Sequence, residues 1–291
     1  MAIVNIVPYF NEEIHLLLRI DCLLDSLDRL IICEADRTYT GIEKGYTCEE
    51  MLDRRGISTD KITVVRVRMP SAVEEPDHWV RERMQRNAGI PLVTPDDVVI
   101  SSDCDEIPRK DVIPLVAEMV RREPDVILGM AMTIHNSRAD LVVTLPFCDN
   151  DILYTFATFA CSAEVLSRTD LSRIREVISY DEKNSGLDVR TVDVHCGWHF
   201  TWMGSPEDRI TKLRSFAHAN EEVPMGVGWL DSDHAAEFVR NYRPAPGSTD
   251  TLGREYYRME RYSIESLPPE LLSNREFRRY YLPDIREHLY S

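Results

Sequence analysis

The residues best suited to chemistry are the acids of Asp103-Cys104-Asp105-Glu106, which directly follow the apolar residues 98–100 and two serines. In an extended segment, side chains two residues apart point the same way, so Asp103 and Asp105 are expected to face one ligand while Cys104 points into the fold. Carboxylate oxygens suit Mn²⁺ or Mg²⁺, and phosphate oxygens usually complete the coordination shell. Such a metal would stabilise the charge on a departing diphosphate. The alternative is a solvated turn after a strand, where aspartate is also common.

A predicted helix over residues 78–89 lies immediately before this strand and carries a candidate phosphate contact. Arg81, Gln85 and Arg86 are expected along one of its faces. A guanidinium binds phosphate in a bidentate manner, so Arg86 is a candidate diphosphate ligand or helix anchor. The alternative is an ordinary solvated face.

The loop after the first predicted strand, residues 2–7, contributes further candidates. Pro8 and Phe10 are expected to line the pocket for the nucleotide base. Asn11 is expected to cap the following helix, with Glu12 in its first turn. Capping alone would also explain these polar residues.

The second predicted strand, residues 29–35, ends near Glu34, which is a candidate contact to the nucleotide sugar, and a polar loop follows it to Gly45. Within that loop Lys44 is a candidate contact to a phosphate or a sugar, with an ordinary surface lysine as the alternative. Ser102, next to Asp103, is a further candidate contact to the nucleotide sugar.

A third cluster lies in residues 195–218, where two of the four tryptophans of the chain, Trp198 and Trp202, flank His199. Their flat apolar faces suit stacking on a sugar ring, although core packing is an equally frequent use of tryptophan. Within this cluster, His199 and Lys212 are further candidate contacts to the nucleotide sugar.

The same cluster holds the candidates for a general base. Glu207 falls in the first turn of a predicted helix over residues 205–219, with Ser205 as its N-cap and Pro206 at its first position. A carboxylate there could take the proton of an acceptor hydroxyl, or simply stabilise the helix dipole. Near the end of that helix, His218 is a candidate metal ligand or a structural histidine.

The segments that must position these residues alternate between strands and helices. Further strands are predicted over residues 61–69, 96–102 and 126–135, with helices over 48–56 and 110–122. Such alternation predicts an α/β fold with a mostly parallel sheet, which binds ligands beyond the carboxyl ends of its strands. Residues 191–203 are expected to be extended, and 220–291 to form loops and short helices.

Composition limits the class of protein. The formal charge of −16 argues against a general nucleic-acid binder. No segment is long and apolar enough for a transmembrane helix, and the first residues lack the pattern of a signal peptide. The seven scattered cysteines include no CxxC pair, which favours a reducing cytoplasm. Peripheral contact with a membrane stays open.

Four motifs in this order, "FNE", "TGIEK", "SDCDEIP" and "GWHFTW" followed by "SPE" and "KLRSFAH", resemble the family 17 glycosyltransferases. The resemblance covers roughly residues 3–220. It implies the GT-A fold, a Rossmann-like α/β arrangement with a mostly parallel central sheet flanked by helices and, here, an irregular helical C-terminal segment. It also implies inverting transfer of N-acetylglucosamine from UDP-GlcNAc with a divalent metal, in which Asp103 and Asp105 match the D-x-D metal motif.

On the same resemblance, Glu207 falls where inverting GT-A enzymes often carry their base, with Asp208 and Asp188 as rivals. We expect one glycosyltransferase domain over residues 1–291, comprising a nucleotide-binding half at 1–110, an acceptor half at 111–220 and a C-terminal wrap at 221–291. Its partners would be a UDP-sugar donor and a saccharide acceptor. The alternatives are a nucleotidyltransferase that makes sugar nucleotides and a non-catalytic binder of the same fold.

Overall fold

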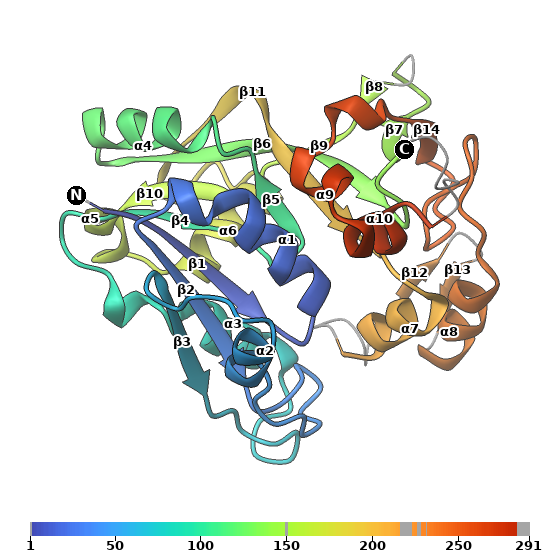
Figure 1. Cartoon of the computed structure of the whole chain (residues 1–291), viewed down its shortest axis with the longest axis horizontal. Coiled ribbons are helices and arrows are strands. Elements are labelled where there is room, and N and C mark those ends of the chain that lie inside the picture. Colours follow the sequence, from blue (N-terminus) through green and yellow to red (C-terminus); the bar gives the residue numbers. More distant parts are fainter. Residues whose placement is uncertain (1, 149–150, 216–222, 226–227, 231, 284–291) are drawn as a thin grey trace. The chain divides into compact units, whose positions relative to one another are not determined.

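The computed structural model describes residues 2–148, 151–215, 223–225, 228–230 and 232–283. They divide into two compact units (Figure 1). Unit 1 comprises Met1–Met132 and Tyr154–Trp198, and unit 2 comprises Thr133–Leu153 and His199–Ser291. The predicted division of a single domain near residues 110 and 220 stays a prediction.

Unit 1 is built on a sheet with the strand order β6-β10-β4-β1-β2-β3. Strands β4, β1, β2 and β3 run parallel, whereas β10 is antiparallel to both of its neighbours. The predicted α/β class is therefore confirmed. The bounds of these strands are β1 Ile3–Tyr9, β2 Arg29–Ala35, β3 Ile62–Val67, β4 Val98–Ser101, β6 Val126–Asn136 and β10 Phe159–Ser162.

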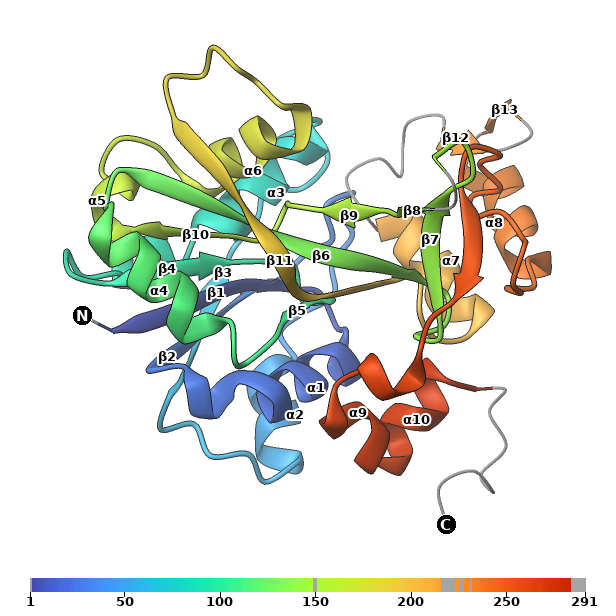
Figure 2. The same cartoon turned by 90° about the horizontal axis from the view of Figure 1, so that it is seen from above.

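Helices cover both faces of this sheet. Figure 2 shows α3 and α6 on one face and α1 and α4 on the other. None of the described helices is long and apolar enough to cross a membrane. The helices of unit 1 are α1 Glu13–Leu23, α2 Cys48–Arg54, α3 His78–Asn87, α4 Ile113–Arg122, α5 Ala163–Leu166 and α6 Leu171–Tyr180, with short 3₁₀ turns at Leu24–Ser26 and Ile90–Leu92.

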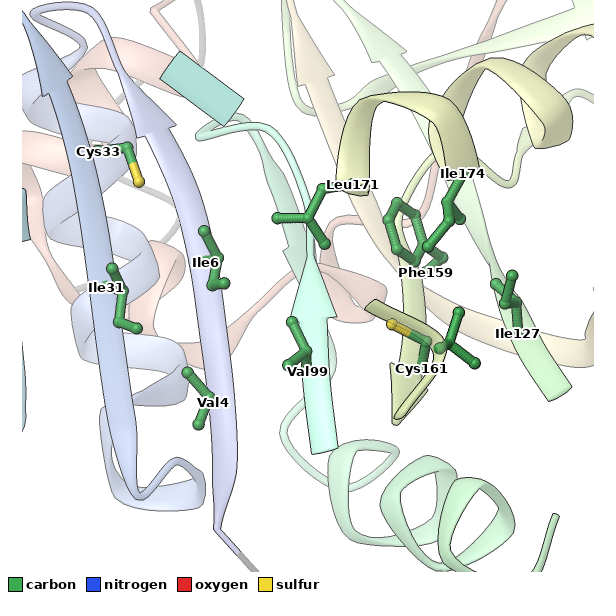
Figure 3. Packing of buried hydrophobic residues seen from close by; sticks show 11 residues of the cluster. Val4, Ile6, Ile31, Cys33, Val99, Ile127, Phe159, Cys161, Leu171 and Ile174 are labelled. Carbon is green, nitrogen blue, oxygen red and sulfur yellow. The ribbon is translucent and has the colours of Figure 1, made fainter. Parts of the chain in front are cut away.

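The core of unit 1 follows from the alternation of side chains along each strand. Val4 and Ile6 of β1 point to the face that α6 covers, where Leu171 and Ile174 complete a buried cluster (Figure 3). Asn5, between them, points to the other face and accepts a hydrogen bond from Arg19 of α1. Because helices cover both faces, β1 reads as a nearly continuous apolar run rather than an alternating one.

Unit 2 contains a small antiparallel sheet and a helical pair. His135, near the end of β6, pairs with β7 (Leu141–Leu145), which also pairs with β8 (Asp151–Ile152) and β14 (Arg258–Arg261). Helices α7 (Pro206–Ser215) and α8 (Ser232–Asn241) pack around a buried cluster. The remaining elements of unit 2 are β12 Val223–Met225, β13 Gly228–Leu230, the 3₁₀ turn Ile264–Ser266, α9 Pro269–Ser273 and α10 Arg275–Tyr281.

The strands and helices predicted in the N-terminal third are all present, with bounds shifted by a few residues. Helix α7 begins at Pro206 as predicted, and its predicted end at residue 219 lies outside the described residues. The segment predicted to be extended is β11, Asp188–Thr201. The sequence reading missed β7, β10 and α6, since short apolar strands and amphipathic segments are hard to distinguish by periodicity alone.

One close approach of two strands depends on a glycine. Strand β11 pairs with β5 (Glu106–Pro108), the strand that follows the acidic turn. A Cβ at Gly197 would lie 2.3 Å from the carbonyl oxygen of Ile107 and 2.7 Å from Cα of Pro108. Only a residue without a side chain allows these two backbones to meet.

We therefore expect Gly197→Ala to lower the free energy of unfolding by about 1–3 kcal/mol, because the new methyl group collides with backbone atoms that cannot rotate away. Chemical denaturation monitored by circular dichroism measures this change. The matched control on the same strand is Val194→Thr, which alters a side chain that is 56% exposed. An unfolding free energy of Gly197→Ala equal to that of the control would contradict the steric argument.

Candidate active site

The acidic residues after β4 form a tight turn, not an extended segment. Strand β4 ends at Ser101, and the backbone N–H of Glu106 donates to the carbonyl of Asp103 at 3.1 Å. The prediction that Asp103 and Asp105 share one face of an extended strand is therefore wrong, because a turn abolishes the two-residue alternation. The Asp103 side chain is 30% exposed, whereas Asp105 is buried.

A buried arginine holds this turn from the side of α1. Arg19 donates to the side-chain oxygen of Asn5 at 2.8 Å and to the backbone carbonyls of Asp103, at 2.6 Å, and of Glu106. Burial lowers the pKa of Arg19, while the three acids of the turn oppose that shift. Arg19 thus fixes the path of the backbone by hydrogen bonds that no aliphatic residue could supply.

Two further arginines bind the carboxylate of Asp103. Arg86 of α3 donates to Oδ1 at 2.7 Å, and Arg175 of α6 donates to Oδ2 at 2.6 Å. Arg86 also donates to Glu82 at 2.8 Å. Burial alone would lower the pKa of Arg86, but the carboxylates of Asp103 and Glu82 raise it well above its usual value. The described partners of Arg86 are the carboxylates of Asp103 and Glu82, and its predicted contact to a diphosphate stays a prediction.

Glu106 is the fully buried member of the turn. Its carboxylate accepts from Arg175 at 2.9 and 3.0 Å, from the Thr158 hydroxyl at 2.9 Å and from the backbone N–H of Asp103 at 2.9 Å. Four donors satisfy a charge that would otherwise be very costly in the protein interior. Ser102 is also fully buried, and its hydroxyl has no hydrogen-bond partner in the described part of the chain.

The loop after β2 closes on a second buried carboxylate, that of Glu34. Its Oε1 accepts from the backbone N–H groups of Thr47, at 2.7 Å, and of Cys48, at 3.1 Å. These groups begin α2, so Glu34 caps a helix that follows it by more than a dozen residues. Lys44 lies 3.5 Å from the same oxygen, and burial lowers its pKa against the opposing effect of Glu34.

Asn11 contributes to this second cluster rather than to the cap of α1. Helix α1 begins at Glu13 with Glu12 in the N-cap position, and no side chain caps it. The predicted cap by Asn11 is wrong because the Asn11 side chain accepts instead from Lys44 and from the Thr47 hydroxyl, each at 3.1 Å. Asn11 adopts a φ of 138°, outside the range that residues with side chains usually occupy.

The other predicted contacts of the first strand lie close to this cluster along the chain. Pro8 is buried within β1, which extends two residues further than predicted and ends at Tyr9. The ring of Phe10 lies 5.8 Å from Lys44 Nζ, within range of a cation–π contact. Glu12 accepts from the backbone N–H of Phe10 at 3.1 Å. A base-binding role for Pro8 and Phe10 stays a prediction.

The two tryptophans of the third cluster are buried, each within its own unit. Trp198 in unit 1 is 7% exposed and packs edge-on against His195, and Trp202 in unit 2 is 6% exposed. They serve the core, the alternative that the sequence left open. Lys212 Nζ lies 5.8 Å from the Trp202 ring, and His199 is half-buried in β11. Their predicted contacts to the donor stay predictions.

The three candidate bases differ in what already binds their carboxylates. Asp208 accepts from the N–H and the hydroxyl of Ser205 at 2.8 and 2.9 Å, which is a capping box at the start of α7. Asp188 forms an ion pair with Arg190 at 2.9 Å. Glu207 is exposed in the first turn of α7. Of the three, Glu207 therefore has the carboxylate with the fewest described partners.

The residues of the turn fit a divalent cation that shares its coordination shell with a substrate. Mg²⁺ in such sites usually takes one or two carboxylates, substrate phosphates and water. Asp103 accepts one arginine on each oxygen, which leaves a second lone pair on both. Among the described residues no group of three or more His, Cys, Asp or Glu side chains could hold a metal by itself. The predicted ligand His218 lies outside the described residues.

Sequence reasoning missed the residues that compensate the acids of the turn. Arg19 and Arg175 contact Asp103, and Thr158 contacts Glu106, although all three lie far from the acidic turn along the chain. The sequence alone predicts no role for Glu106, although it is the most deeply buried acid of the turn. The one signal available was the unusual density of arginine in amphipathic segments whose apolar residues predict burial.

Replacing Arg175 by Met should lower the free energy of unfolding by about 3–5 kcal/mol, because Glu106 would keep a buried charge without its cation. The double variant Arg175→Met, Glu106→Gln should recover part of that loss, since the uncompensated charge is gone. Thermal and urea unfolding of the four proteins in this cycle provide the measurement. The control is Arg168→Met, which breaks an exposed pair with Asp125 and should change stability by less than about 1 kcal/mol. Additive losses in the double variant would contradict the assigned pairing.

The model of glycosyltransferase family 17 matches residues 3–134, which include the acidic turn and the Glu34 cluster. A search of curated proteins found no match. Among solved structures, the mannosyltransferase PcManGT from Pyrobaculum calidifontis, in complex with GDP-Man and Mn²⁺, has a TM-score of 0.43 and 13% identity, over 74% of this chain and 61% of that one.

Two other structures are similarly distant. S. aureus TarS 1-349 in complex with UDP-GlcNAc has a TM-score of 0.42 and 12% identity, over 74% of this chain and 65% of that one. Glucosyl-3-phosphoglycerate synthase from Mycobacterium tuberculosis, with Mn²⁺, UDP and phosphoglyceric acid, has a TM-score of 0.42 and 14% identity, over 94% and 91%. This chain thus covers less than two thirds of the length of PcManGT and of TarS. The resemblance to the family 17 glycosyltransferases that the motifs indicate is confirmed over residues 3–134.

Proposed function

We propose that this protein is a metal-dependent glycosyltransferase that moves N-acetylglucosamine from UDP-GlcNAc to a saccharide acceptor. The observation that carries the proposal is the family 17 match over residues 3–134. The matched segment contains an acidic turn after β4, beside the carboxyl end of the parallel strand β1. That is where sheets of this kind bind their ligands. The donor sugar follows from the family resemblance.

Donor binding would use the acidic turn after β4 and the cluster around Glu34, both in unit 1. Asp103 and Asp105 would hold the divalent cation, which when bound supplies a Lewis acid for the departing diphosphate. Arg19, Arg86 and Arg175 keep the turn in place, so its carboxylates need little reorganisation when the donor arrives.

The transfer would be a single displacement with inversion. The acceptor hydroxyl oxygen forms a bond to the anomeric carbon of the sugar while the bond from that carbon to the diphosphate oxygen breaks. UDP leaves with that electron pair, and the hydroxyl proton passes to Glu207 as general base. The support for Glu207 over its rivals is that Asp208 and Asp188 already serve a helix cap and an ion pair.

Asp105→Asn should weaken Mn²⁺-dependent binding of UDP-GlcNAc by at least about tenfold, because a neutral amide is a much poorer ligand for a hard cation. Isothermal titration calorimetry with UDP-GlcNAc, with and without Mn²⁺, measures the effect. The control is Asp53→Asn, an exposed acid on α2. Equal donor affinity with and without Mn²⁺ in the unmodified protein would exclude metal dependence.

Glu207→Gln should leave the affinity for UDP-GlcNAc within about twofold and lower the turnover by at least about 100-fold, since the amide cannot accept the proton. Release of UDP in the presence of a panel of saccharide acceptors gives the rate. Glu237→Gln, an exposed acid on α8, is the control. If Glu207→Gln keeps its turnover while Asp208→Asn or Asp188→Asn loses it, the base is the rival residue.

A further inference from the structure

Unit 2 contains a buried guanidinium whose described partners are backbone carbonyls. Arg209 in the first turn of α7 is 5% exposed. Its Nη2 donates to the carbonyl of Gly204 at 3.1 Å and to that of Ser137 at 3.5 Å. Its Nε is buried without a hydrogen-bond partner in the described part of the chain. A buried cation with donors to spare is costly unless an anion reaches it.

The other buried arginines are compensated by acids. Arg86 and Arg175 bind carboxylates directly, and Arg19 faces the three acids of the turn. Arg81 also donates to backbone carbonyls, those of Tyr39 and Glu75, but two acids, Glu75 and Asp77, oppose the lowering of its pKa by burial. Each of these positive charges therefore has negative charge from the chain close to it.

The charges near Arg209 differ from those near the other buried arginines. Among the described residues, the charged groups that act on Arg209 are a second arginine, Arg243, and the carboxylate of Asp208. That carboxylate already accepts two hydrogen bonds from Ser205. The other two neighbours, Tyr242 and Tyr280, are phenols, which carry no charge near neutral pH. Burial lowers the pKa of Arg209 below its usual value.

The backbone around Arg209 is held in a fixed and unusual shape. Ser137 and Trp202 adopt left-handed φ values of 66° and 58°, and Gly204 one of 83°. At Gly204 a Cβ would lie 2.5 Å from Asp208 Oδ2 and 2.9 Å from the Tyr280 hydroxyl oxygen, so those two groups are packed against the glycine. Left-handed residues with side chains persist where tertiary contacts impose them, and they cluster at ligand sites.

We propose that Arg209 binds an oxyanion, either a phosphate ester or a carboxylate, with the positive charge of the exposed Arg243 as a weaker contribution. A planar guanidinium with unused donors matches both groups. The site lies outside the segment that matches family 17. The further assignment of this anion to the saccharide acceptor, which would then be an acidic or phosphorylated sugar, rests on the proposed glycosyltransferase function.

The test is calorimetric titration of the full chain with inorganic phosphate and, separately, with acetate at matched ionic strength. Arg209→Gln should weaken binding of the preferred anion by about tenfold or more, because the hydrogen-bond donors that contact the anion are lost. Arg243→Gln should weaken it by a smaller factor, because only the electrostatic attraction of a more distant positive charge is lost. Arg209→Lys, which keeps the charge without the planar fork, should lie between Arg209→Gln and the unmodified protein. The control is Arg261→Gln, an exposed arginine of β14 in the same unit.

Binding of phosphate alone identifies a phosphate ester as the ligand, binding of acetate alone a carboxylate, and either result that depends on Arg209 supports the site. Binding that is unchanged in Arg209→Gln overturns it. So does the absence of binding in the unmodified protein, which would mean that an acid from outside the described residues compensates Arg209. If Arg209→Gln does not fold, unchanged affinity in Arg243→Gln overturns the two-arginine site.

Titration of the same proteins with UDP-GlcNAc separates this proposal from the proposed function. Arginine-dependent anion binding without donor binding would retain the site and refute the glycosyltransferase. Donor binding and turnover without anion binding would refute the site alone. Equal UDP-GlcNAc affinity in Arg209→Gln and Arg261→Gln also shows that the variant is folded.

Discussion

Compensation of buried carboxylates by arginine is the constraint on which the site of unit 1 depends. Glu106 is fully buried and Asp103 is partly so. Arg175 binds both of them, while Arg19 holds the carbonyls of the turn. Removing any one of these cations would leave a charge in the interior that the surrounding apolar core cannot stabilise.

This network links the site to the layers of the fold. Its three arginines come from α1, α3 and α6, helices that lie on opposite faces of the sheet (Figure 2). The apolar cluster under α6 sets the position of Arg175, because Leu171 and Ile174 of the same helix are anchored in the core (Figure 3). Packing and electrostatics are therefore coupled, and the turn is as rigid as the helices that hold it.

Unit 2 also buries a charged side chain, but there the described residues compensate the charge only in part. There the buried cation, Arg209, meets carbonyls and phenols, and one acid that is already engaged. In unit 1 charge is balanced within the chain, whereas the region of Arg209 has an excess of positive charge in the described residues. A balanced network fixes a structure, while an unbalanced one creates affinity for a ligand of the missing sign.

The sequence by itself determined the α/β class, the strands of the N-terminal third, the helix start at Ser205-Pro206 and the resemblance to the family 17 glycosyltransferases over residues 3–134, because periodicity, caps and ordered motifs are local properties. Tertiary structure alone decided the roles of Asn11, Glu34 and Glu106. Lys44 lies 33 residues after its partner Asn11, and Arg175 lies 69 residues after its partner Glu106. No periodic pattern in the sequence encodes pairings at such separations. It also decided that the acidic stretch is a turn, since an arginine from another helix, Arg19, binds its carbonyls.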